Sequence, residues 1–65
     1  MMQQFTNQKA NVTWVFLEDE LKAVGSYINS FGEPKTYVKQ HENEKDFKSH
    51  LNTIKKSKDF IKMNF

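Results

Sequence analysis

The stretch "NVTWVFL", residues 11–17, is the segment of this chain richest in β-branched and aromatic residues. Such residues favour β-strands. Successive side chains of a strand point to opposite faces, which separates two sets: Val12, Trp14 and Phe16, and Thr13, Val15 and Leu17. Both sets are mostly apolar, so the sequence predicts a central strand that is covered on both sides. The preceding "QQFT" predicts a short edge strand that is joined to it through "NQKA" as a hairpin.

A helical pattern follows in "EDELKAVGSYINSFG", residues 18–32. The apolar residues recur at the three- and four-residue steps of one helix face, namely Leu17, Leu21, Val24, Ile28 and Phe31. The acidic run at 18–20 suits the positive end of a helix dipole, and Gly32 stands where a left-handed residue would end the helix. Gly25 would either let another backbone come close or mark an earlier end. We therefore predict a helix whose apolar stripe faces the core.

Residues 34–40, "PKTYVKQ", fit two structures. Thr36, Tyr37 and Val38 favour a strand. Pro34 equally suits the first position of a new helix. The strand is our preferred prediction, and the helix stays open as the alternative.

The segment "NEKDFKSHLNTIKKS", residues 43–57, predicts a second helix. Asn43 can cap its N-terminus. Phe47, Leu51 and Ile54 form the stripe that we expect to be buried, with His50 beside it.

After Asp59 the apolar period changes to two, which is typical of a strand. Two sets of residues alternate there: Phe60, Lys62 and Asn64, and Ile61, Met63 and Phe65. We predict a short final strand or docked extension in which Ile61, Met63 and Phe65 pack on the domain. This leaves an exposed basic cluster at the helix end, where the dipole favours cations: Lys55, Lys56 and Lys58.

The predicted fold is a small single α+β domain over residues 1–65, with two helices packed on a short two- to four-stranded sheet. A chain of 65 residues buries only roughly 60% of the surface that it exposes when unfolded. It has no cysteine to reinforce the core, and its six Phe, two Tyr and one Trp must supply most of the burial. A partner surface, or a second copy in a homodimer, would add further burial.

Residues that carry chemistry are sparse. The chain has no cysteine, and none of its serines lies in a G-x-S-x-G nucleophile elbow. His41 with Glu42 or Glu44 would supply two metal ligands, fewer than a zinc site uses, so we expect His41 to lie in solvent in a charged turn. His50 is expected to be a half-buried packing residue. The sequence predicts no catalytic, cofactor-binding or metal-binding residue, and therefore no enzyme.

Composition also bears on location and source. No segment approaches the roughly 20 apolar residues of a membrane span, and the first residues show no signal peptide, so we expect a cytoplasmic protein without a membrane partner. All 10 basic residues are lysine. Lysine has AT-rich codons whereas most arginine codons are GC-rich, which indicates a low-GC bacterial or viral source. Small binding proteins are common in mobile elements of low-GC genomes, so we expect a phage or mobile element of a low-GC host.

Part of the chain, "TWVFLEDELKAVG" followed by "PKTYVKQH", resembles a known module. It is similar to the N-terminal DNA-binding module of phage and viral antirepressors of the Bro type, in which a Trp-containing strand leads to a helix ending in Gly, then to Pro and His. The matching positions are Trp14, Asp19, Ala23, Gly25, Pro34 and His41. The similarity covers under half of the chain, requires the insertion "SYINS" and lacks the family's later strands. It implies binding to DNA.

Two functions follow from these features. The first is a non-catalytic inhibitor, adaptor or regulator that occupies the surface of a protein partner, because exposed aromatic residues are typical binding anchors. The second is a DNA- or RNA-binding regulator that uses the lysine-rich C-terminal third, where residues 47–65 hold five lysines and one acidic residue. The predicted partner-binding residues are Tyr27, Tyr37, Lys55, Lys56 and Lys58.

Overall fold

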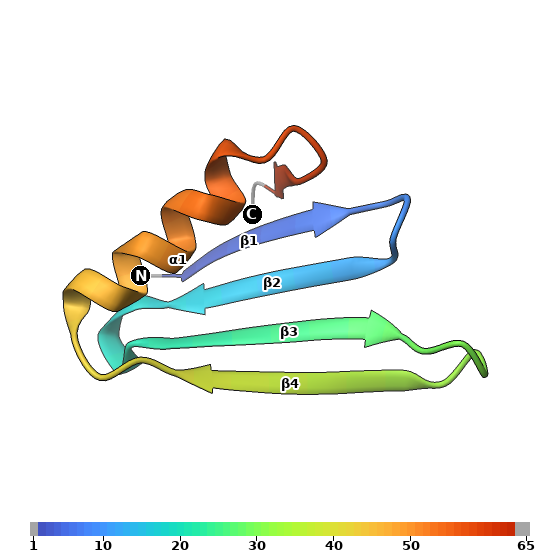
Figure 1. Ribbon diagram of the computed structural model, residues 1–65, viewed down its shortest axis with the longest axis horizontal. Helices are drawn as coiled ribbons and strands as arrows, with labels where there is room; N and C mark the ends of the chain where they lie inside the picture. The colour runs from blue at the N-terminus through green and yellow to red at the C-terminus, as the bar shows by residue number, and fades with distance from the viewer. Residues whose placement is uncertain (1, 64–65) are drawn as a thin grey trace.

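The β-branched and aromatic residues of the N-terminal two thirds form a meander of four antiparallel strands (Figure 1). The structure, a computed structural model, describes residues 2–63. The strands of the meander are β1 (Met2–Asn7), β2 (Val12–Leu17), β3 (Lys22–Ile28) and β4 (Pro34–Gln40). The predicted hairpin of the first two strands and the strand at residues 34–40 are thereby confirmed.

The C-terminal part completes the sheet from its other side. After α1 (Glu44–Lys56), the short β5 (Ile61–Met63) pairs antiparallel with β1, and the strand order is β4-β3-β2-β1-β5. The first strand is therefore not an edge strand, contrary to our prediction. Figure 1 shows α1 lying across one face of the sheet, and the chain folds no helix over the other face within residues 2–63. β2 is central as predicted, but it is covered on one side only.

The predicted fold class is wrong at residues 18–32. The acidic run forms a single 3-10 turn (Glu18–Glu20), Leu21 adopts a left-handed conformation with φ 52°, and β3 follows. The protein is thus a five-stranded antiparallel sheet with one helix, not two helices on a two- to four-stranded sheet. β3 forms hydrogen-bonded ladders with a neighbouring strand on each side. This pairing outweighs the local preference for a helix that the apolar period indicates. The helix implied by the resemblance to antirepressors is likewise absent at these residues.

Gly25 explains part of this outcome. It lies opposite Trp14 in the β2–β3 ladder. A Cβ at Gly25 would lie 3.0 Å from Trp14 Cη2 and 3.1 Å from two further ring atoms. The indole therefore lies over a strand position that must have no side chain. Gly32 is also not a helix end, since its φ of 78° serves the turn between β3 and β4.

The second predicted helix is confirmed as α1. Asn43 caps it, because its side-chain Oδ1 accepts a hydrogen bond of 2.9 Å from the backbone N–H of Asp46. Glu44 and Asp46 in the first turn, and Lys55 and Lys56 in the last, suit the helix dipole.

The core lies between α1 and the sheet. Its buried apolar residues are Phe5, Phe16, Ala23 and Phe47. Phe16 meets both Phe5 and Phe47 edge to face, with ring centroids 5.9 Å apart in each pair. Such pairs add about 0.5–1.5 kcal/mol each to the effect of area burial. The remaining partly buried apolar residues that pack on this cluster are Trp14, Leu21, Leu51, Ile54 and Phe60.

The C-terminal tail is structural, but through a different residue than predicted. Phe60 packs against the core cluster. Ile61 and Met63 instead project from the face opposite α1 and are 57% and 40% exposed, so the prediction that they pack on the domain is wrong. The third predicted residue, Phe65, lies outside the described residues.

Substituting Gly25 tests the packing of the indole. We expect Gly25→Ala to lower the free energy of unfolding by about 1–3 kcal/mol, because the new methyl group would overlap the Trp14 ring. Urea denaturation of the variant would measure this loss. Ser26→Ala, one residue along on the opposite face, is the matched control and should change stability little. A Gly25→Ala protein as stable as the wild type would show that the ring does not lie over this position.

Candidate interaction surfaces

The sheet face opposite α1, called here the open face, is almost free of charge. The strand register places 16 residues on it: Met2, Gln4, Thr6, Thr13, Val15, Leu17, Lys22, Val24, Ser26, Ile28, Pro34, Thr36, Val38, Gln40, Ile61 and Met63. Among these described residues only Lys22 is charged, and its Nζ lies 3.8 Å from a carboxylate oxygen of Glu20. Thr6 and Thr13 share a hydrogen bond of 3.3 Å between their hydroxyl groups. The open face therefore presents apolar groups and neutral polar groups.

Large apolar side chains are exposed on this face. Of the exposed large hydrophobic residues, those on the open face are Met2, Ile28, Val38, Ile61 and Met63. Val38 is 53% exposed although its neighbours in the same cross-strand row, Val24 and Val15, are apolar too. The prediction that Val24, Ile28 and Phe31 face the core is wrong. The first two lie on the open face, and Phe31 is 86% exposed in the turn after β3.

Two of the predicted partner-binding residues come together on the other face of the sheet. Tyr27 lies opposite Lys35, and Tyr37 lies opposite Gly25, so the two tyrosines occupy adjacent cross-strand rows on the side of α1. Both are exposed, Tyr37 at 55% and Tyr27 at 42%. Residues i and i+2 of a strand share a face, and Lys35 and Lys39 therefore flank Tyr37 on the same side.

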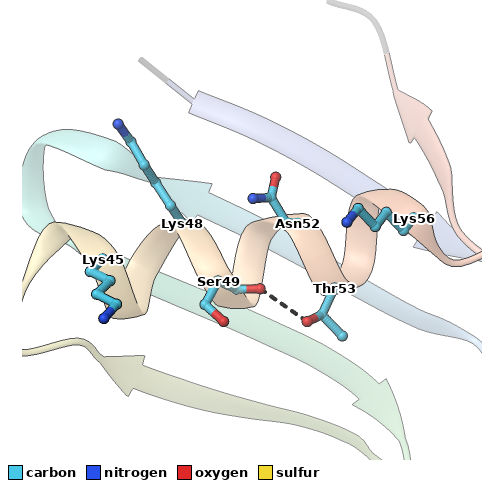
Figure 2. Close-up of a pocket in the computed structure, with 6 residues that line it drawn as sticks. All are labelled: Lys45, Lys48, Ser49, Asn52, Thr53 and Lys56. Carbon is cyan, nitrogen blue, oxygen red and sulfur yellow. Dashed lines mark hydrogen bonds between the residues drawn. The ribbon is translucent and has the colours of Figure 1, made fainter.

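The predicted lysine cluster lies at and just beyond the end of α1. Lys55 and Lys56 lie in the last turn of α1, and Lys58 follows it; all three are exposed, as predicted. Lys56 belongs to a depression of about 480 Å³ lined by Lys45, Lys48, Ser49, Asn52, Thr53 and Lys56, all from α1 (Figure 2). Lys58 instead lines a smaller depression with Lys9 and Asp59, beside the turn between β1 and β2. Both tyrosines lie on β3 and β4, at the opposite side of the sheet from β5.

The helix depression is open surface and not an enclosed binding site. Figure 2 shows Ser49 and Thr53 on the flank of α1 that faces β3 and β4, while Lys48 points away from that flank. Thr53 donates its hydroxyl proton to the backbone carbonyl of Ser49 at 2.9 Å, and Lys48 pairs with Glu44 at 2.8 Å. Some polar groups of this surface are therefore already hydrogen-bonded or ion-paired within α1.

The two histidines form a pair that sequence analysis did not predict. His41 Nε2 lies 3.1 Å from His50 Nδ1, so one ring donates and the other accepts. His41 is 8% exposed, contrary to the expected solvent position. Its backbone N–H donates to the carbonyl of Leu21 at 2.9 Å, and its ring meets Phe47 edge to face with centroids 5.9 Å apart. His50 is partly buried as predicted, against Trp14 and Phe16, with ring centroids at 4.7 and 5.0 Å. No local sequence signal links residues nine positions apart.

The two histidines serve as packing residues. Burial lowers the pKa of His50 below its ordinary value, and the nearby His41 and Lys39 lower it further. A neutral His50 can accept or donate one hydrogen bond to His41, whereas two protonated rings would bring two N–H donors together. Within residues 2–63, no group of three or more His, Cys, Asp or Glu residues is placed to hold a metal ion.

Comparisons with known proteins add no relative. No family model, no curated protein and no solved structure matches this chain. In the described part of the chain, no helix has the length and apolar character needed to cross a membrane.

Protonation of His50 makes stability depend on pH. The pKa of His50 in the folded protein lies below its ordinary value of 6.5, so the unfolded state binds more protons as the pH falls below about 6.5. The stabilisation is fully present above that pH and is lost as the pH falls through the folded pKa. We expect a lower Tm at about pH 5.5 than at about pH 7.5, a window in which carboxylates titrate little. His50→Gln should reduce this difference in Tm. An equal drop in that variant would rule out His50 as its source.

Proposed function

We propose that this protein is a non-catalytic binding protein that acts as an inhibitor, adaptor or regulator by occupying the surface of a protein partner. One observation carries the proposal: in a chain with 28% charged residues, the open face carries Lys22 as its single charge and exposes Met2, Ile28, Val38, Ile61 and Met63. Exposed apolar side chains gathered on a nearly uncharged face mark sites of protein interaction.

The charge distribution indicates the character of the partner. A surface without charges cannot compensate the cost of removing a partner's charged groups from water. The open face therefore favours a partner surface that is apolar and poor in charge. Nucleic acid is disfavoured on this face, because its phosphates require several lysine or arginine contacts.

The area of the open face favours a transient complex. The five strands have 6, 6, 7, 7 and 3 residues. At about 3.4 Å per residue and a strand spacing of about 4.8 Å, they give a plane on the order of 500 Å². Burying this plane and an equal area of the partner removes about 1,000 Å² from water, near the lower limit of specific interfaces. A complex of this size suits reversible regulation.

The test compares opposite faces of the same two strands. The double variant Val38→Gln with Ile61→Gln replaces apolar groups of the open face by neutral polar ones. Lys39→Gln with Lys62→Gln changes the neighbouring residues, which point to the other face. All four positions are exposed, so both variants should fold, and circular dichroism would check this.

Affinity capture from a lysate of the source cells then measures partner binding. We expect the wild type and the lysine variant to retain the same protein, and the Val38–Ile61 variant to lose it. Retention by the Val38–Ile61 variant would contradict binding through the open face. If sedimentation velocity shows that the wild type self-associates through this face and the Val38–Ile61 variant does not, the occupant is a second copy of the chain and not another protein.

A further inference from the structure

The helix leaves part of its own side of the sheet uncovered. α1 packs over Phe5 and Phe16, in β1 and β2. On β3 and β4 the same face carries four exposed or partly exposed side chains, called here the tyrosine margin: Tyr27, Lys35, Tyr37 and Lys39. β4 is an edge strand, and all of its residues are exposed, so the margin is open to solvent above the sheet and beside it.

We propose that the tyrosine margin binds single-stranded nucleic acid without sequence preference. Unpaired bases stack on the rings of Tyr37 and Tyr27, and the phosphates lie near the ammonium groups of Lys35 and Lys39. This activity is separate from the proposed protein binding, because the margin and the open face are opposite faces of the sheet.

The Tyr37 ring is held in place for stacking. Its centroid lies 6.4 Å from that of Trp14, and the two planes meet at 86°. An edge-to-face contact restrains a ring without covering it completely, and Tyr37 remains 55% exposed. Gly25, opposite Tyr37 in the ladder, adds no side chain that could cover the ring. A restrained and partly exposed aromatic ring stacks a base at low entropic cost.

The charges beside the rings are available for phosphate. Lys35 and Lys39 each stand two residues from Tyr37, about 6.8 Å along the strand. Neither lysine forms an ion pair with a residue in the range 2–63, in contrast to Lys22 and Lys48. Along the chain, the acidic residues within three positions of these lysines are Glu33, whose carboxylate accepts a hydrogen bond from Asn29, and Glu42. The first turn of α1 adds Glu44, which pairs with Lys48, and Asp46.

The ligand is single-stranded because stacking requires a free base face. Base pairs in a duplex cover their faces with each other, and an acidic peptide has no flat ring for the tyrosines. All basic residues of the chain are lysines, which contact phosphate as point charges and lack the forked geometry that reads guanine. The margin is therefore expected to bind without reading sequence.

The experiment uses fluorescence anisotropy with a labelled oligothymidylate of roughly 12 nucleotides. Tyr37→Leu removes the stacking ring and Tyr37→Phe keeps it. Lys35→Gln with Lys39→Gln removes two charges from the margin. Lys55→Gln with Lys58→Gln removes two exposed charges elsewhere and is the matched control. Trp14, the only tryptophan, supplies a second readout, since its fluorescence should change when a base stacks on the adjoining Tyr37.

We expect Tyr37→Leu to weaken binding by at least about fivefold and Tyr37→Phe to bind like the wild type. The slope of log affinity against log salt is negative for phosphate contacts. The Lys35–Lys39 variant should reduce the magnitude of this slope by about 1.4, and the Lys55–Lys58 control should reduce it much less. A duplex of equal length should bind more weakly than the single strand.

Several results would overturn the proposal. These are no binding at about 50 mM salt, equal affinity for the duplex, equal losses in the two lysine variants, or equal affinity for Tyr37→Leu and wild type. Polyglutamate that competes as well as the oligonucleotide would show that the margin recognises acidic chains and not bases.

Discussion

The edge-to-face packing of Phe16 between Phe5 and Phe47 is the interaction on which this structure depends. Phe47 comes from α1 and the other two rings from adjacent strands, so this cluster joins the helix to the sheet. In so short a chain no second cluster of equal size is available; the buried apolar residues of the described part are these three and Ala23. The buried core therefore covers only one face of the sheet.

This constraint divides the molecule into two chemically different sides. The side with α1 holds the lysines of β4 and of the helix, together with the exposed tyrosines. The open face holds neutral side chains, with Lys22 as the exception among the described strand residues. Because a single helix covers only part of one side, a small chain retains both an apolar surface and a basic aromatic surface. The two proposals in this article correspond to these two surfaces and stand independently.

Local signals predicted the elements that local chemistry determines. The β-branched run at residues 12–17, the strand at 34–40 and the Asn43-capped helix were all predictable. The segment at 18–32 was not, because an acidic run and a coincidental apolar period imitate a helix start and stripe. What decides this segment is tertiary: the ladders on both sides of β3 and the Trp14 ring over Gly25. The same holds for the site residues. Tyr27 and Tyr37 occupy adjacent cross-strand rows only through the strand register. Lys56 and Lys58 line different depressions, and the His41–His50 contact has no sequence signature.

The central claim is that one face of the sheet is closed by the phenylalanine cluster while the other is left open. Paramagnetic relaxation of side-chain methyl protons by a soluble, neutral gadolinium chelate measures this directly in the free protein at low concentration. We expect strong relaxation for the methyl groups of Val38, Ile61 and Met63, and weak relaxation for those of Ala23 and Leu51. Weak relaxation of Val38, Ile61 and Met63, or strong relaxation of Ala23, would contradict it.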